Sequence, residues 1–338
     1  MECLSHYLRS MGHTRIKNWL RKVGVILLFG MAANVASAQD GWVAVESGAG
    51  GKDLNAVYFA DSKRGWVAGD GGFISRTTDG GLTWTQASAG TKDAVNDIYF
   101  RNKEDGYLLA GNSIFQSEDG GVTWRETRRY FASDFGGAQP ELYSVRFSGK
   151  NRGWVVGSVS ANDVVVDSLV IYTNDGGKSW QRQRVPTKQE LIHVDFADEK
   201  RGWIVGFGGT ILHTEDGGET WAEQLSNTKA TLYHVDFRNE RLGWAVGERA
   251  TILRTVDGGL TWTAGEATVR ATFLSVEFPD EKAGWLVGRG GVILRSDDGG
   301  RTWIQQASKT KQNLYALFMD KKMGWAVGGN GIILQYER

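Results

Sequence analysis

The stretch Thr-Val-Asp-Gly-Gly-Leu-Thr-Trp at residues 255–262 decides the fold, because its last six residues follow a pattern that occurs six times in this 338-residue chain. The pattern, Asp-Gly-Gly-x-Thr/Ser-Trp, occupies residues 79–84, 119–124, 175–180, 216–221, 257–262 and 298–303. Successive copies are 40, 56, 41, 41 and 41 residues apart. A period near 41 residues, with strand-like sequence between turns, is typical of a β-propeller in which each repeat forms one four-stranded blade.

A second phrase, Gly-Trp followed by small and β-branched residues, alternates with the first and counts the blades. It begins at Gly65, Gly106 (followed by tyrosine instead of tryptophan), Gly153, Gly202, Gly243, Gly284 and Gly324. The chain therefore contains seven units. In a representative unit we expect strands over residues 191–196, 203–206, 211–214 and 220–224, because turn residues separate these apolar, β-branched segments.

The seventh unit ends after its third strand, at residues 332–336, and we predict its fourth strand at the other end of the chain. Residues 41–46, Gly-Trp-Val-Ala-Val-Glu, match the tryptophan-containing fourth strands of the other units. The predicted fold is an all-β, seven-bladed β-propeller of four-stranded antiparallel blades, in which strand 41–47 completes the blade at 312–337. Such closure removes the exposed sheet edges that promote aggregation.

Residues 1–38 have the sequence of a cleaved signal peptide, which leaves residues 39–338 as the propeller. Basic residues precede an apolar run at 23–31, and Ala36-Ser37-Ala38 stands before Gln39. The alternatives are a buried amphipathic helix in this region and a start of translation at Met11. We expect an exported protein, soluble after cleavage, in the periplasm or, in a photosynthetic organism, the thylakoid lumen.

Charge and cysteine content exclude several classes of function for the mature chain. Five of the 39 basic residues and one of the 39 acidic residues lie in residues 1–38, which leaves 34 basic and 38 acidic residues. A chain of that balance is not expected to bind nucleic acid, because phosphate contacts need clustered cations. The only cysteine, Cys3, is also removed, so no disulfide, thiol nucleophile or cysteine-bound metal is expected. We predict no cofactor.

The repeated aspartates are interpreted as structural. Ser or Thr stands two residues before each of them, and the full pattern resembles the Asp-box, or BNR repeat, of sialidases and related propellers. Six near-identical copies around a ring cannot converge on one substrate, whereas aspartate accepts N–H bonds within a turn and tryptophan packs between sheets. The structural Asp-box residues are Asp79, Asp119, Asp175, Asp216, Asp257 and Asp298.

The repeat is broken at two places, both near the third blade, and there we predict the contact with a partner. The link before this blade is long, at residues 125–140, and the turn after its second strand carries about eight extra residues within 158–168. Links and second-to-third-strand turns open on one face of a propeller, so we expect the two insertions to be neighbours. Arginine and tyrosine are favoured in protein interfaces; the alternative is a tolerated surface insertion. The predicted partner-binding residues are Arg125, Arg128, Arg129, Tyr130, Phe131, Asp163 and Asp167.

A second irregularity lies on the predicted innermost strands. His193-x-Asp195 and His234-x-Asp236 occupy equivalent positions in adjacent blades, and Arg146 and Glu277 stand at the aspartate position on either side. We expect these side chains to pair across the blades. The alternative is a metal site formed by two histidines and two aspartates.

No enzyme site is predicted. Sialidases carry an Arg-Ile-Pro-like motif before their first Asp-box, whereas Arg184-Val185-Pro186 follows the third Asp-box and lies in a link. A glycosidase needs two carboxylates at a set separation, and Asp134, Asp163 and Asp167 are candidates only as acids outside the repeat.

Both phrases together, after an export signal, resemble the photosystem II stability/assembly factor family over residues 41–338. This resemblance implies a non-catalytic propeller that binds proteins through an arginine-bearing face and helps assemble or stabilise membrane protein complexes. The implied partner is such a complex or its assembly intermediate on the exported side, with no small-molecule substrate, and the chain is expected to be a monomer. The alternative function is a carbohydrate-active propeller, either a sialidase-like glycosidase or a lectin.

Overall fold

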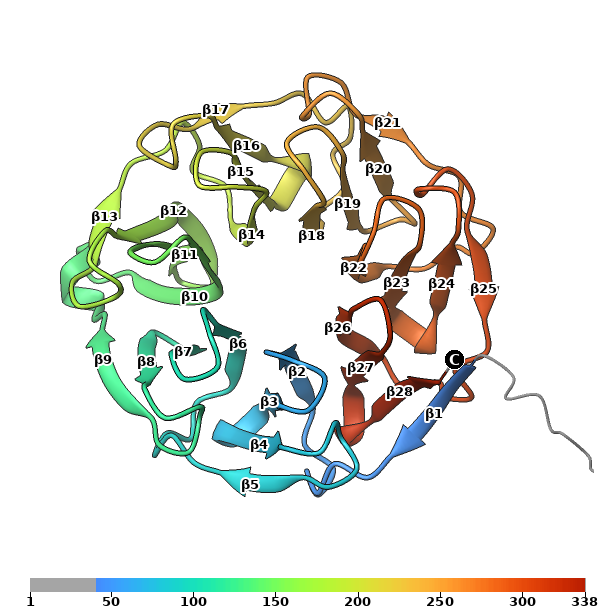
Figure 1. Cartoon of the computed structure of the whole chain (residues 1–338). Coiled ribbons are helices and arrows are strands. Elements are labelled where there is room, and N and C mark those ends of the chain that lie inside the picture. The colour runs from blue at the N-terminus through green and yellow to red at the C-terminus, as the bar shows by residue number, and fades with distance from the viewer. Residues whose placement is uncertain (1–40, 338) are drawn as a thin grey trace, which may run out of the picture. The chain divides into compact units, whose positions relative to one another are not determined.

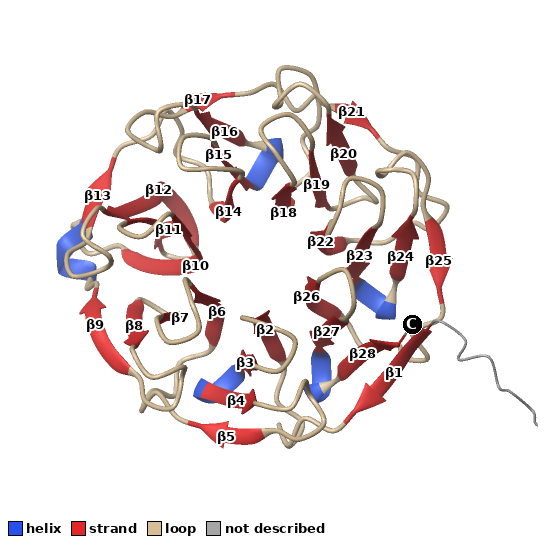
Figure 2. Ribbon diagram, in the orientation of Figure 1, coloured by secondary structure: helices blue, strands red, loops and turns tan. Residues whose placement is uncertain are grey.

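The structure is a computed structural model that describes residues 41–337, so the predicted signal peptide lies outside the described residues. Seven four-stranded antiparallel sheets stand around a ring, and each sheet runs from the centre to the perimeter (Figures 1 and 2). Among the described residues, no helix is long and apolar enough to cross a membrane. The predicted seven-bladed propeller is confirmed.

The blades are numbered along the chain, and the strands of each blade are given in order from the channel outward. The first blade consists of β2 (Leu54–Phe59), β3 (Gly65–Gly69), β4 (Phe73–Thr77) and β5 (Thr85–Ala87). The second consists of β6 (Val95–Phe100), β7 (Gly106–Ala110), β8 (Ser113–Ser117) and β9 (Arg125–Arg129). The third consists of β10 (Gln139–Ser148), β11 (Arg152–Ala161), β12 (Val164–Thr173) and β13 (Gln181–Gln183).

The remaining blades follow the same order. The fourth consists of β14 (Leu191–Phe196), β15 (Gly202–Gly206), β16 (Ile211–Thr214) and β17 (Ala222–Glu223). The fifth consists of β18 (Leu232–Phe237), β19 (Gly243–Gly247), β20 (Ile252–Thr255) and β21 (Thr263–Ala264). The sixth consists of β22 (Phe273–Glu277), β23 (Gly284–Gly288), β24 (Ile293–Ser296) and β25 (Ile304–Gln306). The seventh consists of β26 (Leu314–Met319), β27 (Gly324–Gly328), β28 (Ile333–Glu337) and β1 (Gly41–Val45).

The seventh blade closes the ring as predicted. β1 pairs antiparallel with β28, with Trp42 opposite Tyr336 and Val45 opposite Ile333. The closing strand ends at Val45, two residues before the predicted end. Trp42 is buried, and its ring centroid lies 5.3 Å from that of Tyr336, so the two ends of the propeller share one core.

The tryptophans of the Gly-Trp phrase form the contacts between blades. Most second-strand tryptophans face an aromatic residue at the end of the inner strand of the next blade or directly after it, as in the stack of Trp244 on Phe278 with 3.4 Å between ring centroids. Six of the seven blade junctions have such a stack, with Tyr107 replacing tryptophan at one of them. At the seventh junction, Trp285 packs in the same core cluster as Met319. These rings are therefore core, because stacked aromatic pairs bury large apolar area.

The Asp-box turns repeat one set of hydrogen bonds. In the fifth blade, the Thr255 hydroxyl donates to Asp257 Oδ1 at 2.7 Å and accepts the N–H of Gly259 at 2.8 Å. The N–H and hydroxyl of Thr261 donate to the two carboxylate oxygens of Asp257 at 2.9 and 2.6 Å. The same four bonds occur at the other five copies. Each aspartate is thus occupied within its own turn.

Candidate functional site

The third blade departs from the other six in the length of its strands. β10, β11 and β12 each contain ten residues, whereas the corresponding strands of the other blades contain four to six. Leu142 pairs with Gly157 as Leu191 pairs with Gly206 in the fourth blade, so the additional residues extend the sheet past the level at which the other blades turn. We call this extension, residues 139–141 and 158–167, the tongue.

The insertion at residues 158–168 was predicted as a long turn, and this is wrong. The extra residues continue β11 and β12 as a hairpin whose turn is only Asn162 and Asp163, both with positive φ (51° and 62°). Asn and Asp tolerate this conformation better than most residues, which suits a two-residue hairpin. The turn presents Asp163 at the end of the tongue. Asp163 also lines an open groove with Asp93 and Glu141, between the tongue and the second blade.

The link before the third blade also differs from the predicted loop. Arg125, Arg128 and Arg129 belong to β9, the outer strand of the second blade, and all three are exposed. Arg129 forms an ion pair with Glu126 at 2.8 Å. Arg128 lies over the ring of Tyr130, 4.7 Å from its centroid.

Tyr130 was predicted at the binding surface, but its side chain is only 5 % exposed and packs in the core with Leu109 and Ile114. The buried ring of Tyr130 therefore packs against the guanidinium of Arg128 and does not face solvent. The exposed aromatic residue of the link is Phe131, at 55 %. It precedes the short 3-10 helix η2 (Ala132–Phe135).

The two insertions meet as predicted, and Arg182 on β13 joins them. Its guanidinium forms an ion pair with Asp167 on β12 at 2.7 Å and lies 5.0 Å from the ring centroid of Phe135 in η2. Two exposed residues of the tongue were missed from the sequence, Val164 at 63 % and Val166 at 44 %. Their signal was the run of three valines at 164–166 inside an insertion, because consecutive apolar residues are unusual in an exposed segment.

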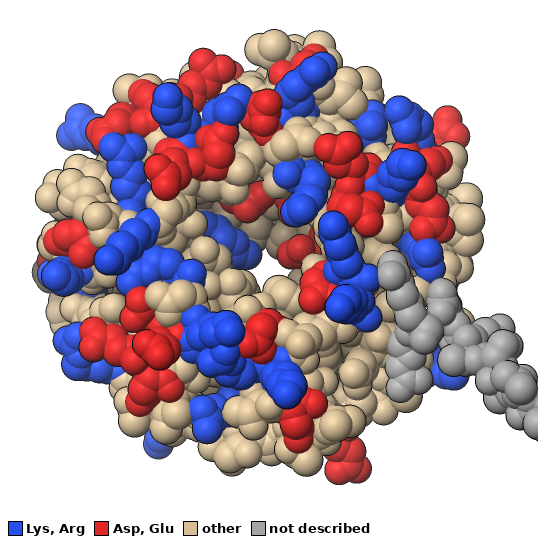
Figure 3. Space-filling model, viewed as in Figure 1, with Lys and Arg blue, Asp and Glu red and all other residues tan. Residues whose placement is uncertain are grey.

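The central channel is the second irregular region. All seven inner strands contribute residues to the channel wall, and a cavity of about 560 Å³ lies between them. Two aligned positions on these strands lie two residues apart. The later position carries Tyr58, Tyr99, Arg146, Asp195, Asp236, Glu277 and Phe318, and the earlier position carries Ala56, Asp97, Ser144, His193, His234, Ser275 and Ala316. All of these residues except Tyr99 and Ser144 line the cavity. In Figure 3 the channel is open at the centre of the molecule, and charged side chains are visible inside its mouth.

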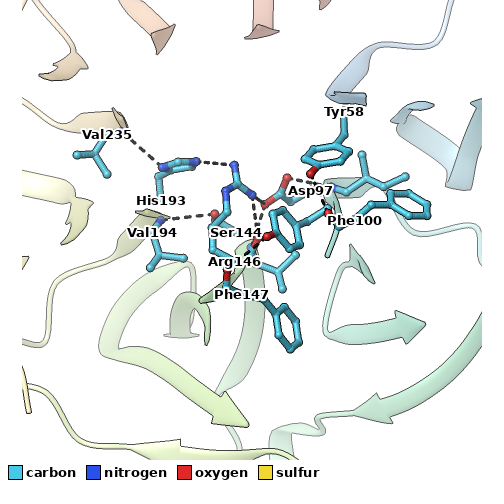
Figure 4. Close-up of polar contacts among 12 residues, drawn as sticks. Tyr58, Asp97, Phe100, Ser144, Arg146, Phe147, His193, Val194 and Val235 are labelled. Atoms are coloured by element: carbon cyan, nitrogen blue, oxygen red, sulfur yellow. Dashed lines mark hydrogen bonds and ion pairs between the residues drawn. The ribbon is translucent and has the colours of Figure 1, made fainter. Parts of the chain in front are cut away.

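Arg146 connects three blades across the channel wall (Figure 4). Its Nη1 donates to Asp97 Oδ2 at 2.9 Å, and its Nη2 lies 3.1 Å from Nε2 of His193. The ring of His193 stacks on that of His234 with 3.7 Å between centroids. A guanidinium only donates, and the backbone N–H of Val235 is also directed at His193, with 3.4 Å between its nitrogen and Nδ1. Because a neutral imidazole has only one acceptor nitrogen, these two contacts are alternatives. Burial first, and then His234 and Arg146, hold the pKa of His193 well below its ordinary value, so His193 is neutral.

The predicted pairing across blades is therefore confirmed for the histidines and corrected for the aspartates. Asp195 and Asp236 do not contact the histidines; each accepts a backbone N–H from the next blade at 2.8 Å, from Phe237 and Phe278 respectively. Burial, and then the charge of Asp195, raise the pKa of Asp236 well above its ordinary value. Burial, and then Asp236, do the same to the pKa of Glu277.

The metal alternative finds no support in this geometry. Among residues 41–337, no three His, Cys, Asp or Glu side chains are grouped so as to hold a metal ion. The histidine rings face each other in a stack, and one of them is occupied by Arg146.

The family model of the photosynthesis system II assembly factor YCF48 matches residues 83–188, 173–229, 223–305 and 267–337. The chain belongs to this family. No curated protein matches the chain. The predicted resemblance to photosystem II assembly factors is thus confirmed, and these matched segments contain the Asp-box repeats from the second to the sixth.

Solved structures with the same fold include members of the YCF48 family. YCF48 bound to D1 peptide is 21 % identical, with a TM-score of 0.72 over 89 % of this chain and 98 % of that chain. YCF48 from Cyanidioschyzon merolae is 18 % identical, with a TM-score of 0.70 over 88 % and 99 %. Virginiamycin B lyase from Staphylococcus aureus is 13 % identical, with a TM-score of 0.73 over 89 % and 100 %. At these identities the likeness shows a shared fold alone.

Proposed function

We propose that this chain is a non-catalytic assembly factor that binds a membrane protein subunit through the tongue and the adjacent arginines of β9. Membership of the YCF48 family supports the role, and the complex of YCF48 with D1 peptide supports a segment of a photosystem subunit as the ligand. The observation that carries the proposal is the third blade, which alone among the seven described blades extends past the ring.

The tongue has the composition of a protein-binding surface. Val164 and Val166 expose apolar side chains next to a charged turn. Exposed apolar residues on a protein surface are usually scattered singly, whereas these two lie together on the tongue. Arg128 is held against Tyr130, so its guanidinium loses little conformational freedom on binding. Arginine is enriched among the residues that contribute most to the binding energy of protein interfaces.

A peptide titration tests this proposal. We expect D1 peptide to bind the mature chain in isothermal titration calorimetry, and the double variant Arg128→Glu, Val164→Ser to bind it at least tenfold more weakly. The matched control is Arg249→Glu, which reverses an exposed charge on the turn between β19 and β20, far from the tongue. Equal binding by the double variant and the control would overturn the proposal, provided that the thermal midpoints of all three proteins agree.

The proposal includes export and a monomeric state. The sequence of residues 1–38 supports export. The pairing of β1 with β28 supports a monomer, because it leaves no unpaired edge of β28 that a second copy could complete. Amino-terminal sequencing of the protein from a periplasmic or lumenal fraction should begin at Gln39. Light scattering of the mature chain should give the mass of one copy, and a dimer would contradict this part.

A further inference from the structure

The channel has two chemically different walls. Phe318, Tyr58 and Tyr99 follow one another on the seventh, first and second blades, with ring centroids 5.7 and 5.4 Å apart. Asp195, Asp236 and Glu277 occupy the equivalent positions on the fourth, fifth and sixth blades. Of the three aromatic residues, Tyr58 and Phe318 line the cavity. Because the seven blades stand around a ring, this aromatic wall faces the acidic wall across the cavity.

The cavity contains more carboxylates than cations. Its lining includes Asp97, Asp195, Asp236 and Glu277, and the single arginine or lysine among the lining residues is Arg146. Arg146 forms its ion pair with Asp97. The two histidines do not supply positive charge, because burial lowers the pKa of both, that of His234 to about 3. The acidic wall therefore faces the cavity without a cation of its own among the described lining residues.

Two buried polar atoms at the acidic wall also have no hydrogen-bond partner in the described part of the chain. One is the hydroxyl of Ser275, a residue that is 1 % exposed, lies two positions before Glu277 and lines the cavity. The other is Nδ1 of His234. Buried polar groups in proteins are nearly always hydrogen-bonded, and a ligand in the cavity that carries donors would give these two atoms a partner.

One mouth of the channel has the same chemistry. Tyrosines on three inner strands donate their hydroxyls to acidic residues, and these pairs lie where the inner strands begin. The pairs are Tyr143 with Glu141 at 3.1 Å, Tyr233 with Glu248 at 3.3 Å and Tyr315 with Asp53 at 2.9 Å. Acidic residues at the mouth of a channel attract ions of the opposite charge toward it.

We propose that the channel binds an organic cation of the primary amine or guanidinium class. Its charged nitrogen would bond to Asp236, Glu277 and the Ser275 hydroxyl, while its carbon chain or second cationic end would lie against Tyr58 and Phe318, where cation–π attraction acts. The cavity volume is typical of a small-ligand site. The cation is either a free di- or polyamine or the side chain of a lysine or arginine in a bound peptide. This site is separate from the tongue and does not rest on the proposed function.

Calorimetric titration with 1,4-diaminobutane, spermidine, agmatine and acetylated tripeptides containing lysine or arginine tests the proposal. We expect at least one of these cations to bind the mature chain, and 1,4-butanediol, which has the same length and no charge, not to bind. The double variant Asp236→Asn, Glu277→Gln should bind at least tenfold more weakly. The matched control is Glu223→Gln, which removes an exposed carboxylate from the outer strand β17, outside both the tongue and the cavity, and it should bind as the unmodified chain does.

The ligand panel separates the two sources of the cation, because binding of the free amines indicates a metabolite and binding of the tripeptides alone indicates a protein side chain. A second measurement keeps the test independent of folding. Binding at pH 7 should release protons, since the carboxyl groups of the acidic wall must ionise to pair with the cation, and the apparent enthalpy should change between buffers of different ionisation enthalpy. No binding by any cation at millimolar concentration, or equal binding by the folded double variant, overturns the proposal.

Discussion

At the perimeter of the propeller, six turns make the same four hydrogen bonds, whereas at the channel the seven inner strands carry six different pairs of side chains. The perimeter turns are local, because each joins residues at most four positions apart. The channel contacts join neighbouring blades, as Arg146 and Asp97 do over 49 residues. The repeated turns at the perimeter thus stabilise the ring. The inner strands differ in sequence from blade to blade, so a binding site can form at the channel.

Acid should destabilise all the Asp-box turns at the perimeter together, and this loss of stability is the largest expected effect. The hydroxyl of Thr83 and then its N–H lower the pKa of Asp79 from 3.8 to about 2, and Ser179 does the same for Asp175. A carboxylate with a lowered folded-state pKa stabilises the fold above its unfolded pKa and stops doing so as pH falls through the folded value. We therefore expect unfolding by circular dichroism between pH 4 and 2. A transition centred above pH 5 would contradict the role of these turns.

Trp244→Ala should cause the largest loss among single substitutions. Trp244 is fully buried, stacks on Phe278 and donates its Nε1–H to the carbonyl of Gly299 at 3.1 Å. Removing a buried aromatic side chain costs about 3–5 kcal/mol, because a cavity remains. Urea unfolding measures this loss. Trp244→Phe keeps most of the stack and should lose less; an equal loss would show that the stack is not the cause.

Thr255→Val tests whether the perimeter turns are equivalent. The substitution keeps the shape but leaves the N–H of the buried Gly259 without its acceptor, which costs about 1–3 kcal/mol. Thr214→Val removes the corresponding acceptor of Gly218 and should cost the same. Unfolding free energies that differ by more than about 1 kcal/mol between the two variants would disprove equivalence.

Asp236→Asn should change stability in the opposite direction. The pKa of Asp236 is raised by burial and Asp195, more than Arg238 and Arg146 lower it, so ionisation opposes folding. This penalty is absent below the unfolded pKa and appears as pH rises through the folded pKa. The variant should melt higher at pH 8, by roughly 2 °C, the shift that about 1 kcal/mol produces in a large domain. At pH 4 its melting temperature should equal that of the unmodified chain, and a gain at both pH values would point to another cause.

Val164→Ser should have the smallest effect on stability. Val164 is exposed on the tongue, and substitutions at such positions change the free energy of unfolding by about 0.5 kcal/mol or less. Thermal unfolding measures it. A large loss would mean that the exposed valines support the tongue itself, and then the binding test at this position would need Val166→Ser instead.

The third blade shows which features of the binding surface could be predicted from the sequence and which could not. The 56-residue step located the irregular blade. Phe131 is exposed in the predicted link, whereas Arg128 is exposed on strand β9. The burial of Tyr130 was not predictable from the insertion alone, because it depends on Leu109 and Ile114 of the preceding blade. The channel wall was half predicted: the histidines and aspartates stood out, whereas Asp97, Ser275 and the aromatic wall needed all seven inner strands aligned.

The sequence by itself determined the architecture, namely seven blades, their order and their closure by residues 41–45. It did so because the Asp-box bonds and the paired glycines are local, and local patterns survive repetition. Only the tertiary structure decided that the insertion at 158–168 lengthens a sheet and that Arg146 pairs with Asp97 and His193. The first outcome depends on pairing between strands of the third blade. The second depends on contacts between neighbouring blades, which no single segment of the sequence contains.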